Sequence, residues 1–476
     1  MFAVFCGTIC GIITSGYPIS VVASIAVAVL SITNNLICTT SDGLKVDCHL
    51  CGKPIPTQSV NFILEQNLNQ QLFKCVPINS AFEAAISGFS SDIPWLVFSA
   101  FHIGKAVQVT QLGHRAAFFL ISYLDSSLLG IGYSICGAEL LLSPFIPSNT
   151  ARGGGIVFPV VKSIIDLIKL PEEESGPVYA YLTMIGGHSN SITSSLFVTS
   201  MAGNPLVAST AEKVFGIKYS FTTWALGCFV PGLFVLLVVP LIANHIYKPK
   251  FDTTLIRQEI VLQKSSLGPL SIKEWKLILI LALCLVLWAG SSIFKIGSTI
   301  VAFSAILSLL LLDILVWNDI ASNSAAWDTF YWLSIFFAFA NQLSELGISA
   351  FIGKTLSFIL EGTSPIVALV ALSTVYYFST YMFSSTTSHI VALVGPFMSA
   401  AKELNCNPFL FTAVISSFST ISACLAPYCC GCLAIYASLP YVKQNEWFYA
   451  GILSAGAHFL IFTVVGIPWY WAIGWL

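Results

Sequence analysis

Two runs of small polar side chains interrupt long apolar sequence, and their chemistry suits the binding of ions. Residues 147–155 read Pro-Ser-Asn-Thr-Ala-Arg-Gly-Gly-Gly, and residues 384–389 read Ser-Ser-Thr-Thr-Ser-His. Hydroxyl and amide groups donate hydrogen bonds to anions, and their oxygens are ligands for hard cations such as sodium. An unpaired polar group at bilayer depth is costly unless it lines a cavity. The runs therefore predict a polar site inside a membrane protein, whereas one such run alone would equally suit close packing of helices.

The backbone at the first run is expected to leave the helical path. Pro144 and Pro147 lead into the run, and three glycines end it. Broken helices expose N–H and carbonyl groups, from which secondary transporters build sites for anions and their coupling ions. Two more interruptions follow apolar stretches: residues 201–205 (Met-Ala-Gly-Asn-Pro) and residues 424–432, which include Cys429 and Cys430.

A constant spacing relates the two runs. Subtracting 148 from 385 gives 237, and the same offset relates Trp95 to Trp332 and Pro159 to Pro396. This offset is close to half of the 476 residues, as an internal duplication requires. We therefore predict two structural repeats, which are inverted so that their polar runs enter the membrane from opposite faces.

The composition indicates the environment of the chain. Hydrophobic residues make up 56% of it and charged residues only 9%, against about 25% charged residues in soluble domains. This predicts an all-α polytopic membrane protein without a separate soluble catalytic domain. The net charge of −2 argues against nucleic acid as a partner.

The apolar stretches and charges predict a division of the chain into three parts. Residues 1–247 form the first repeat, with a re-entrant hairpin at 144–170, and residues 277–476 form the second, with a hairpin at 383–402. Residues 248–276 form a linker rich in lysine, which the positive-inside rule assigns to the cytoplasm. The first apolar stretch, Phe2 to Thr14, lacks the basic region and cleavage site of a signal peptide. It is short for a hydrocarbon core of about 30 Å, so we expect a truncated N-terminus.

One cysteine pair lies in a polar loop. Cys48 and Cys51 have the spacing of a CxxC motif, and Cys38 and Cys75 are near them in the sequence. A zinc site would need a second ligand pair at suitable spacing, and none is evident. A disulfide, or no particular role, is the favoured interpretation, and a metal site is the alternative.

Three segments together resemble the divalent anion/sodium symporter family, most closely its branch of 2-oxoglutarate/malate translocators. They are residues 148–154 (Ser-Asn-Thr-Ala-Arg-Gly-Gly), 201–205 (Met-Ala-Gly-Asn-Pro) and 466–471 (Gly-Ile-Pro-Trp-Tyr-Trp). The resemblance covers nearly the whole chain. It implies a homodimer of elevator-type carriers that transport dicarboxylates by sodium symport or by exchange, in a bacterial inner membrane rather than a plastid inner envelope. No cofactor is expected apart from sodium as a coupling ion.

The resemblance also implies the residues of the site. The substrate-binding set is Ser148, Asn149, Thr150, Ser385, Thr386 and Thr387, with Arg152 as a further candidate. A first sodium site would involve Ser148, Asn149, Ser200 and Asn204. A second would involve Ser385, Thr386 and the backbone at Cys429 and Cys430. The second half departs from the family pattern, because Thr386 replaces an amide residue and the two cysteines replace a Gly-Thr pair.

Three charged or titratable residues near the runs have two interpretations each. The guanidinium of Arg152 matches a carboxylate of the substrate, but it equally suits a carboxylate inside the protein. His188 and His389 are expected to be packing residues, with proton coupling as the alternative.

Two other classes of protein are alternatives to a carrier. A membrane-embedded enzyme could use Cys429 or Cys430 as a thiol nucleophile with His389 as its base, although no third member of such a site is evident. An anion channel would share the polar lining. Concentrative uptake distinguishes a carrier from a channel, and hydrolysis of an ester or peptide would favour the enzyme.

Overall fold

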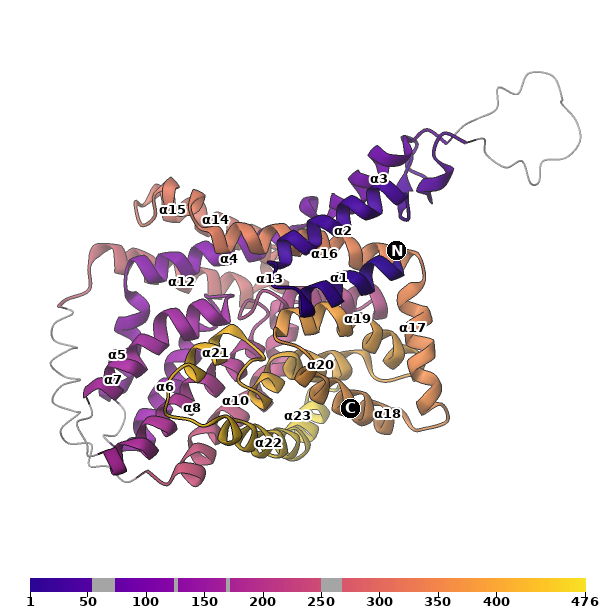
Figure 1. Cartoon of the computed structure of the whole chain (residues 1–476). Coiled ribbons are helices and arrows are strands. Elements are labelled where there is room, and N and C mark those ends of the chain that lie inside the picture. Colours follow the sequence, from indigo (N-terminus) through magenta and orange to yellow (C-terminus); the bar gives the residue numbers. More distant parts are fainter. Residues whose placement is uncertain (54–72, 124–126, 168–171, 250–267) are drawn as a thin grey trace, which may run out of the picture.

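The structure is a computed structural model that describes residues 1–53, 73–123, 127–167, 172–249 and 268–476 (Figure 1). Residues 250–267 of the predicted linker and residues 168–170 of the predicted first hairpin therefore lie outside the described chain. The described part is almost entirely helical, and its one sheet is a two-stranded hairpin.

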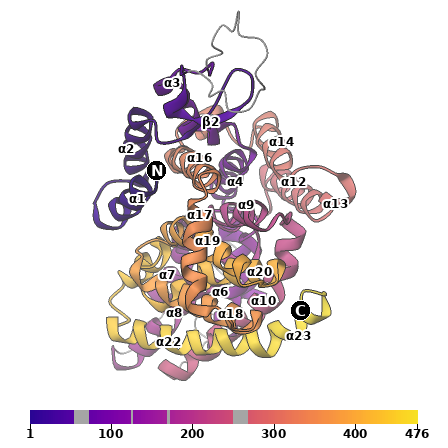
Figure 2. The same cartoon turned by 90° about the vertical axis from the view of Figure 1, so that its right-hand side faces the viewer.

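The helices form two layers, which Figure 2 shows one above the other. The first layer holds α1 (Phe2–Thr14), α2 (Ile19–Thr33), α3 (Pro77–Ile86), α4 (Asp92–Val109), α12 (Ile272–Ala289), α13 (Ser291–Phe294), α14 (Ser298–Leu311), α15 (Trp317–Ala321) and α16 (Ser324–Glu345). Helices α5 (Leu112–Tyr123) and α17 (Ile348–Ser357) lead from this layer into the other, which we call the site layer.

The site layer contains every polar run and break that the sequence singles out. Its elements are α6 (Leu128–Leu142), the π-helix η3 (Thr150–Val157), α7 (Phe158–Leu167), α8 (Glu172–Leu196), α9 (Asn204–Phe215), α10 (Phe221–Tyr247), α18 (Pro365–Ser379), α19 (Thr386–Glu403), α20 (Pro408–Ile421), α21 (Gly431–Ala437), α22 (Gln444–Ile461) and α23 (Ile467–Ala472). Short helical turns extend some of these helices: η5 (Thr380–Met382), η6 (Ser422–Leu425) and η7 (Phe462–Gly466).

Within the described residues, four helices are long and apolar enough to cross a membrane. They are α10, α18 with η5, α20 with η6, and the continuous run from α22 to α23. A fifth span is possible if α16 and α17, which are bent by 70°, count as one. This confirms the predicted polytopic helical fold.

The packing of α4 on α16 shows how the two repeats are oriented. The offset of 237 makes these helices equivalent, since it relates Trp95 to Trp332. The ring of Trp95 lies 4.7 Å from that of Phe330, and one turn farther along α4 the ring of Phe98 lies 4.7 Å from that of Trp327. The residue numbers of the contacts on α16 fall as those on α4 rise, so these equivalent helices are antiparallel. The repeats are therefore inverted, as predicted.

The bounds of the two hairpins differ from the prediction. Residues 144–170 hold the turn and only one arm, η3 with α7, and residues 383–402 likewise hold the turn and most of α19. The other arms are α6 and α18, which lie before the predicted ranges. The reason is local: both preceding arms are as apolar as a full span, so hydropathy alone does not separate them from one. The polar runs thus lie at the tips of the hairpins.

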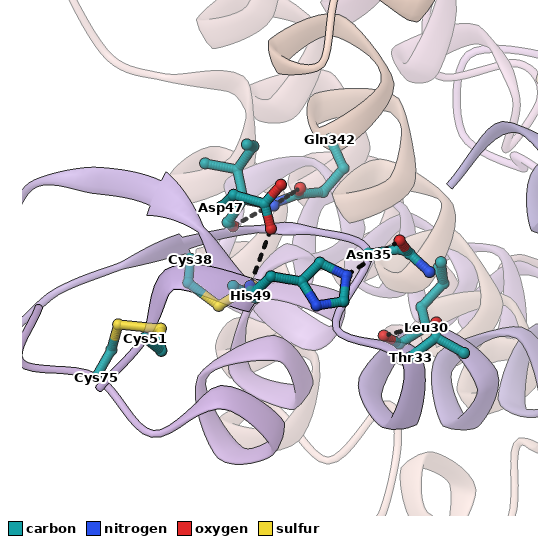
Figure 3. The surroundings of a disulfide bond; sticks show 11 residues. Leu30, Thr33, Asn35, Cys38, Asp47, His49, Cys51, Cys75 and Gln342 are labelled. Carbon is teal, nitrogen blue, oxygen red and sulfur yellow. Dashed lines mark hydrogen bonds between the residues drawn. A yellow bond between two sulfur atoms is a disulfide. The ribbon is translucent and has the colours of Figure 1, made fainter. Parts of the chain in front are cut away.

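The cysteine-containing loop between α2 and α4 is closed by two disulfides, which Figure 3 shows. Cys38 pairs with Cys48, and Cys51 pairs with Cys75. This confirms the disulfide interpretation, although Cys48 and Cys51 do not pair with each other. The loop carries strands β1 (Ile37–Thr39) and β2 (Lys45–Asp47) and the turn η1 (Cys48–Leu50).

The same loop is attached to the end of α16. The side chain of Gln342 accepts a hydrogen bond from Ile37 N (2.8 Å) and donates one to Ile37 O (3.0 Å). Lys45 forms an ion pair with Glu345 at the last residue of α16. Because protein disulfides form in oxidising compartments, this end of α16 belongs on the extracytoplasmic side.

Candidate functional site

The tip of the first hairpin holds the Ser-Asn-Thr run. Ser148 Oγ accepts a hydrogen bond from Ala151 N (3.1 Å), and Asn149 Oδ1 accepts one from Thr150 N (2.9 Å). These side chains satisfy free N–H groups where η3 begins, as helix caps do. Ser148 and Asn149 are half-buried and Thr150 is exposed. The tip therefore presents hydroxyl and amide groups outside the packed interior of the hairpin.

The first helix break separates α8 from α9. Residues 197–203 are not helical, and Asn204 begins α9. Asn204 Nδ2 donates to the carbonyl oxygens of Ser194 (2.8 Å) and Phe197 (3.0 Å), which the end of α8 leaves without helical partners. Its Oδ1 is buried and accepts no hydrogen bond. Ser200 is also fully buried, and its Oγ accepts from Phe197 N (3.2 Å).

The tip of the second hairpin leads directly into an α-helix. Ser385 is the N-cap of α19, and its Oγ accepts a hydrogen bond from Ser388 N (3.4 Å). Thr386 is buried, whereas Ser385 and Thr387 are half-buried. The predicted second-half residues thus lie in the first turn of α19.

The second helix break, residues 426–430, separates η6 from α21 and contains Cys429 and Cys430. Both cysteine side chains are buried. Cys429 Sγ donates to the carbonyl oxygen of Thr380 (3.6 Å), in the turn that ends the first arm of the second hairpin. The thiols therefore face protein, and these two cysteines can supply hard oxygen ligands only through their backbone carbonyls.

Each hairpin tip touches the break of its own repeat. In the first repeat, Thr199 Oγ1 donates to the carbonyl oxygen of Pro144 (2.6 Å). In the second, the hydrogen bond from Cys429 to Thr380 makes the corresponding connection.

Each break also touches the hairpin of the other repeat. A methyl group placed on Gly431 would lie 2.6 Å from Oγ1 of Thr150, and one placed on Gly203 would lie 2.7 Å from Cδ1 of Ile390. At either position an added methyl group would displace the facing side chain. The four contacts form a closed ring: first tip, first break, second hairpin, second break, and back to the first tip. The structure thus brings the four predicted segments together.

Arg152 is directed into the protein. Its side chain is fully buried, and Nε donates to Glu139 Oε2 (2.8 Å). Nη1 donates to the carbonyl oxygens of Ile146 and Ser200, each at 2.8 Å. Nη2 faces three acceptors on α8: Ser194 Oγ (2.8 Å), Asn190 O (3.4 Å) and Thr193 Oγ1 (3.4 Å). The second interpretation of Arg152, a carboxylate inside the protein, is the one that the structure shows.

Glu139 and Asn190 are site-layer residues that the sequence analysis missed. Both are fully buried, and Asn190 Nδ2 donates to Glu139 Oε2 (3.0 Å). Glu139 is the one charged residue in the apolar stretch 128–146. An ionisable residue at membrane depth marks a functional or paired position by default, and that signal would have identified it.

The two histidines are packing residues in this structure. His389 Nε2 lies 2.8 Å from Ser379 Oγ, and its ring packs at a tilt against that of Tyr376, with ring centres 4.4 Å apart. His188 Nδ1 lies 3.3 Å from Ser454 Oγ. Among the described residues, no hydrogen bond joins either histidine side chain to a cysteine thiol. The geometry does not assemble a thiol nucleophile with a histidine base.

Comparison with known proteins agrees with this arrangement. The family profile "Sodium:sulfate symporter transmembrane region" matches residues 1–476. "Putative malate transporter YflS" of Bacillus subtilis (strain 168) is 30% identical over 477 residues, which cover 100% of this chain and 91% of the relative. The L-tartrate/succinate antiporter of Escherichia coli (strain K12) is 29% identical over 472 residues, covering 98% and 91%.

A solved structure supports the fold independently. The YdaH transporter of Alcanivorax borkumensis superposes with a TM-score of 0.55 at 12% identity, over 94% of this chain and 98% of that one. The family and these relatives are transporters, so the protein is a transporter and not an enzyme. The chain belongs to the sodium:sulfate symporter family of membrane proteins, the divalent anion/sodium symporters that its motifs resemble.

Proposed function

We propose that this protein carries dicarboxylates of the 2-oxoglutarate and malate type across its membrane, by sodium symport or by exchange. The ring of two hairpin tips and two helix breaks is the observation that carries the proposal. Each tip presents hydroxyl or amide groups, and each break leaves backbone groups without helical partners. A malate transporter and a tartrate/succinate antiporter among the relatives support four-carbon dicarboxylates as the substrate class.

The substrate-binding residues in this proposal are Ser148, Asn149, Thr150, Ser385, Thr386 and Thr387. A dicarboxylate has an anionic group at each end, and the two tips supply one set of donors for each. Hydroxyl, amide and backbone N–H donors hold carboxylates without a fixed counter-charge. Arg152 is left out of the set, because acceptors within the protein surround its guanidinium.

Sodium fits the first repeat better than the second. Asn204 Oδ1 is a buried hard oxygen without a partner, and Ser148, Asn149 and Ser200 lie in the two segments beside it. A buried acceptor without a donor is costly, and a bound cation would remove that cost. In the second repeat, Ser385 and Thr386 supply hydroxyls, while Cys429 and Cys430 supply only backbone carbonyls.

The two layers suit an elevator mechanism, in which the site layer moves against the first layer. All four segments of the ring belong to the site layer and would move together. The contacts between the layers include Lys213 Nζ on α9, which lies 4.0 Å from the ring centre of Phe337 on α16. The homodimer implied by the resemblance is tested by light scattering of the purified protein.

Uptake of labelled dicarboxylates into proteoliposomes tests the proposal. Vesicles are empty or preloaded with malate, with and without an inward sodium gradient, and 2-oxoglutarate, malate, succinate and tartrate are compared. Accumulation above the external concentration in a sodium gradient indicates symport, and uptake only into preloaded vesicles indicates exchange. Equilibration without accumulation under every condition would indicate a channel, and no uptake of any dicarboxylate would refute the proposal.

A further inference from the structure

One guanidinium joins every part of the first-repeat half of the site. Arginine has five N–H donors in a rigid plane, and Arg152 directs all three of its nitrogens at protein acceptors. Its bonds reach α6 through Glu139, the hairpin turn through Ile146 O, and the first break through Ser200 O. These three segments are separate in the sequence, and no other described side chain bonds to all of them.

The anchored atoms lie next to the proposed ligands. Ile146 is two residues before Ser148, and Ser200 is itself in the proposed sodium set. The backbone N–H of Arg152 also donates to Ser148 O (2.8 Å), so this residue holds the tip from both its main chain and its side chain. The distance between the tip and the break therefore depends on where the guanidinium lies.

Glu139 in turn determines where the guanidinium lies. Its Oε2 accepts from Arg152 Nε (2.8 Å), Asn190 Nδ2 (3.0 Å) and Thr193 Oγ1 (3.4 Å). Both charged side chains are fully buried. A buried ion pair contributes little net stability compared with apolar residues of similar size. The bonds of Glu139 to Arg152 and α8 instead hold the guanidinium in one place.

The second repeat has a neutral counterpart at the same positions. The offset of 237 carries Glu139 to Tyr376 and Arg152 to His389 (139 + 237 = 376; 152 + 237 = 389). These two residues also touch, with ring centres 4.4 Å apart. Tyr376 OH lies 2.7 Å from Ser419 Oγ on the second broken helix. Both repeats thus have a contact between the two hairpin arms at this position. In the first repeat the contact is an ion pair, and in the second it is a contact between two rings.

We propose that Glu139 and Arg152 are positioning residues that hold the first hairpin tip and the first helix break in one ion-binding geometry. They act through Ser148 and Ser200 and do not touch the substrate themselves. This inference takes the identity of the bound ligands from the proposed function, but the bonds of Glu139 and Arg152 do not depend on that function. The second hairpin, which is held by a neutral pair, is the less constrained of the two.

Hydrogen exchange of the ligand-free protein tests the geometry, because exchange rates report local opening. In Arg152→Gln, exchange is expected to rise about tenfold or more in peptides covering 143–150 and 197–204, and to stay unchanged in peptides covering 383–386 and 426–430. Tyr376→Phe is the matched control, and its effect should be confined to the second pair of peptides. Unchanged exchange at both first-repeat peptides in Arg152→Gln would overturn the proposal.

Transport kinetics separate positioning from a merely structural role. Arg152→Lys keeps the charge but not the planar set of donors. Glu139→Gln combined with Arg152→Gln removes both charges, so that no unpaired charge remains buried to unfold the protein. In both variants the half-saturating concentrations of sodium and substrate are expected to rise about 10- to 100-fold, as they do when a residue that holds the ligands of a metal site is replaced. The maximal rate per folded molecule should fall less.

A structural role alone would lower the amount of folded protein and leave both half-saturating concentrations unchanged, which would contradict the proposal. The wild-type protein in the same vesicles tests the proposed function separately. If it takes up no dicarboxylate, the proposed function is wrong. The hydrogen-exchange experiment still decides whether Arg152 holds the tip against the break.

Discussion

The two hairpin tips occupy equivalent positions in the duplicated fold, yet they are built differently. The first leads into a π-helix with three glycines, and a methyl group on Gly153 would lie only 2.3 Å from Cys432 Sγ. The second leads into a regular α-helix with the bulky Ile390 at the equivalent position (153 + 237 = 390). π-Helical turns are often found at functional sites. Duplication therefore preserved where the tips lie, while the bonds that hold them diverged.

The largest expected effect concerns the inversion that makes this comparison meaningful. The linker is predicted to be cytoplasmic, and the inverted repeats and the disulfides of the loop between α2 and α4 place that loop and the C-terminus on the opposite side. Cys6→Ser with Cys10→Ser removes the exposed free thiols, and cysteines are then introduced at Leu44, Lys273 or Leu476. A membrane-impermeant maleimide on intact cells should label positions 44 and 476 and spare 273. Labelling of 273 together with 44 would refute the inverted arrangement.

The next largest effect is expected on dicarboxylate uptake when side chains of the first tip are removed. Hydrogen bonds to charged groups contribute about 1.5–3 kcal/mol, so Asn149→Ala and Thr150→Ala should each lower dicarboxylate uptake about 10- to 100-fold. Thr387→Ala, the equivalent of Thr150 in the second repeat, should lower it less. Uptake is divided by the amount of folded protein in the membrane, measured by size-exclusion fluorescence. Near-normal uptake by both first-tip variants would remove this tip from the site.

A smaller effect should come from the close approach at Gly153. Overpacking a buried position costs about 1–3 kcal/mol, so Gly153→Ala should lower the free energy of unfolding by that amount. Combining it with Cys432→Gly should recover part of the loss, because the facing sulfur is removed. Thermal unfolding in detergent measures both variants. A Gly153→Ala protein as stable as the wild type would show that the glycine is not required for packing.

The smallest effect is expected at the neutral pair of the second repeat. Tyr376→Phe keeps the ring packed on His389 and removes only the hydroxyl bonded to Ser419. One such hydrogen bond contributes about 1 kcal/mol, so the loss of stability should be of that size. Charge-dependent behaviour of this variant, such as a salt-sensitive unfolding temperature absent from the wild type, would contradict a neutral contact.

Much of this fold could be predicted from the sequence, for identifiable reasons. Apolar stretches give the helices, and an offset of 237 gives the repeat because both halves kept residues such as Trp95 and Trp332. The arms α6 and α18 were missed as hairpin arms, because a re-entrant arm and a span have the same apolar character. The partners of Arg152 could not be predicted, since Asn190 and Ser194 meet it only through the packing of α8 on the first hairpin. Glu139 alone had a usable signal, a charge within an apolar stretch.

The central claim is that the first repeat provides the better sodium site. It is tested most directly by the sodium dependence of uptake in variants of each repeat. Initial rates of labelled malate or 2-oxoglutarate uptake are measured against sodium concentration for the wild type, Asn149→Ala, Asn204→Ala and Thr386→Ala. We expect a shallow dependence in the wild type, with the half-saturating sodium concentration raised about tenfold or more by the first-repeat substitutions and less by Thr386→Ala. A steep dependence on several ions that Thr386→Ala flattens, while Asn149→Ala and Asn204→Ala leave it unchanged, would contradict the account.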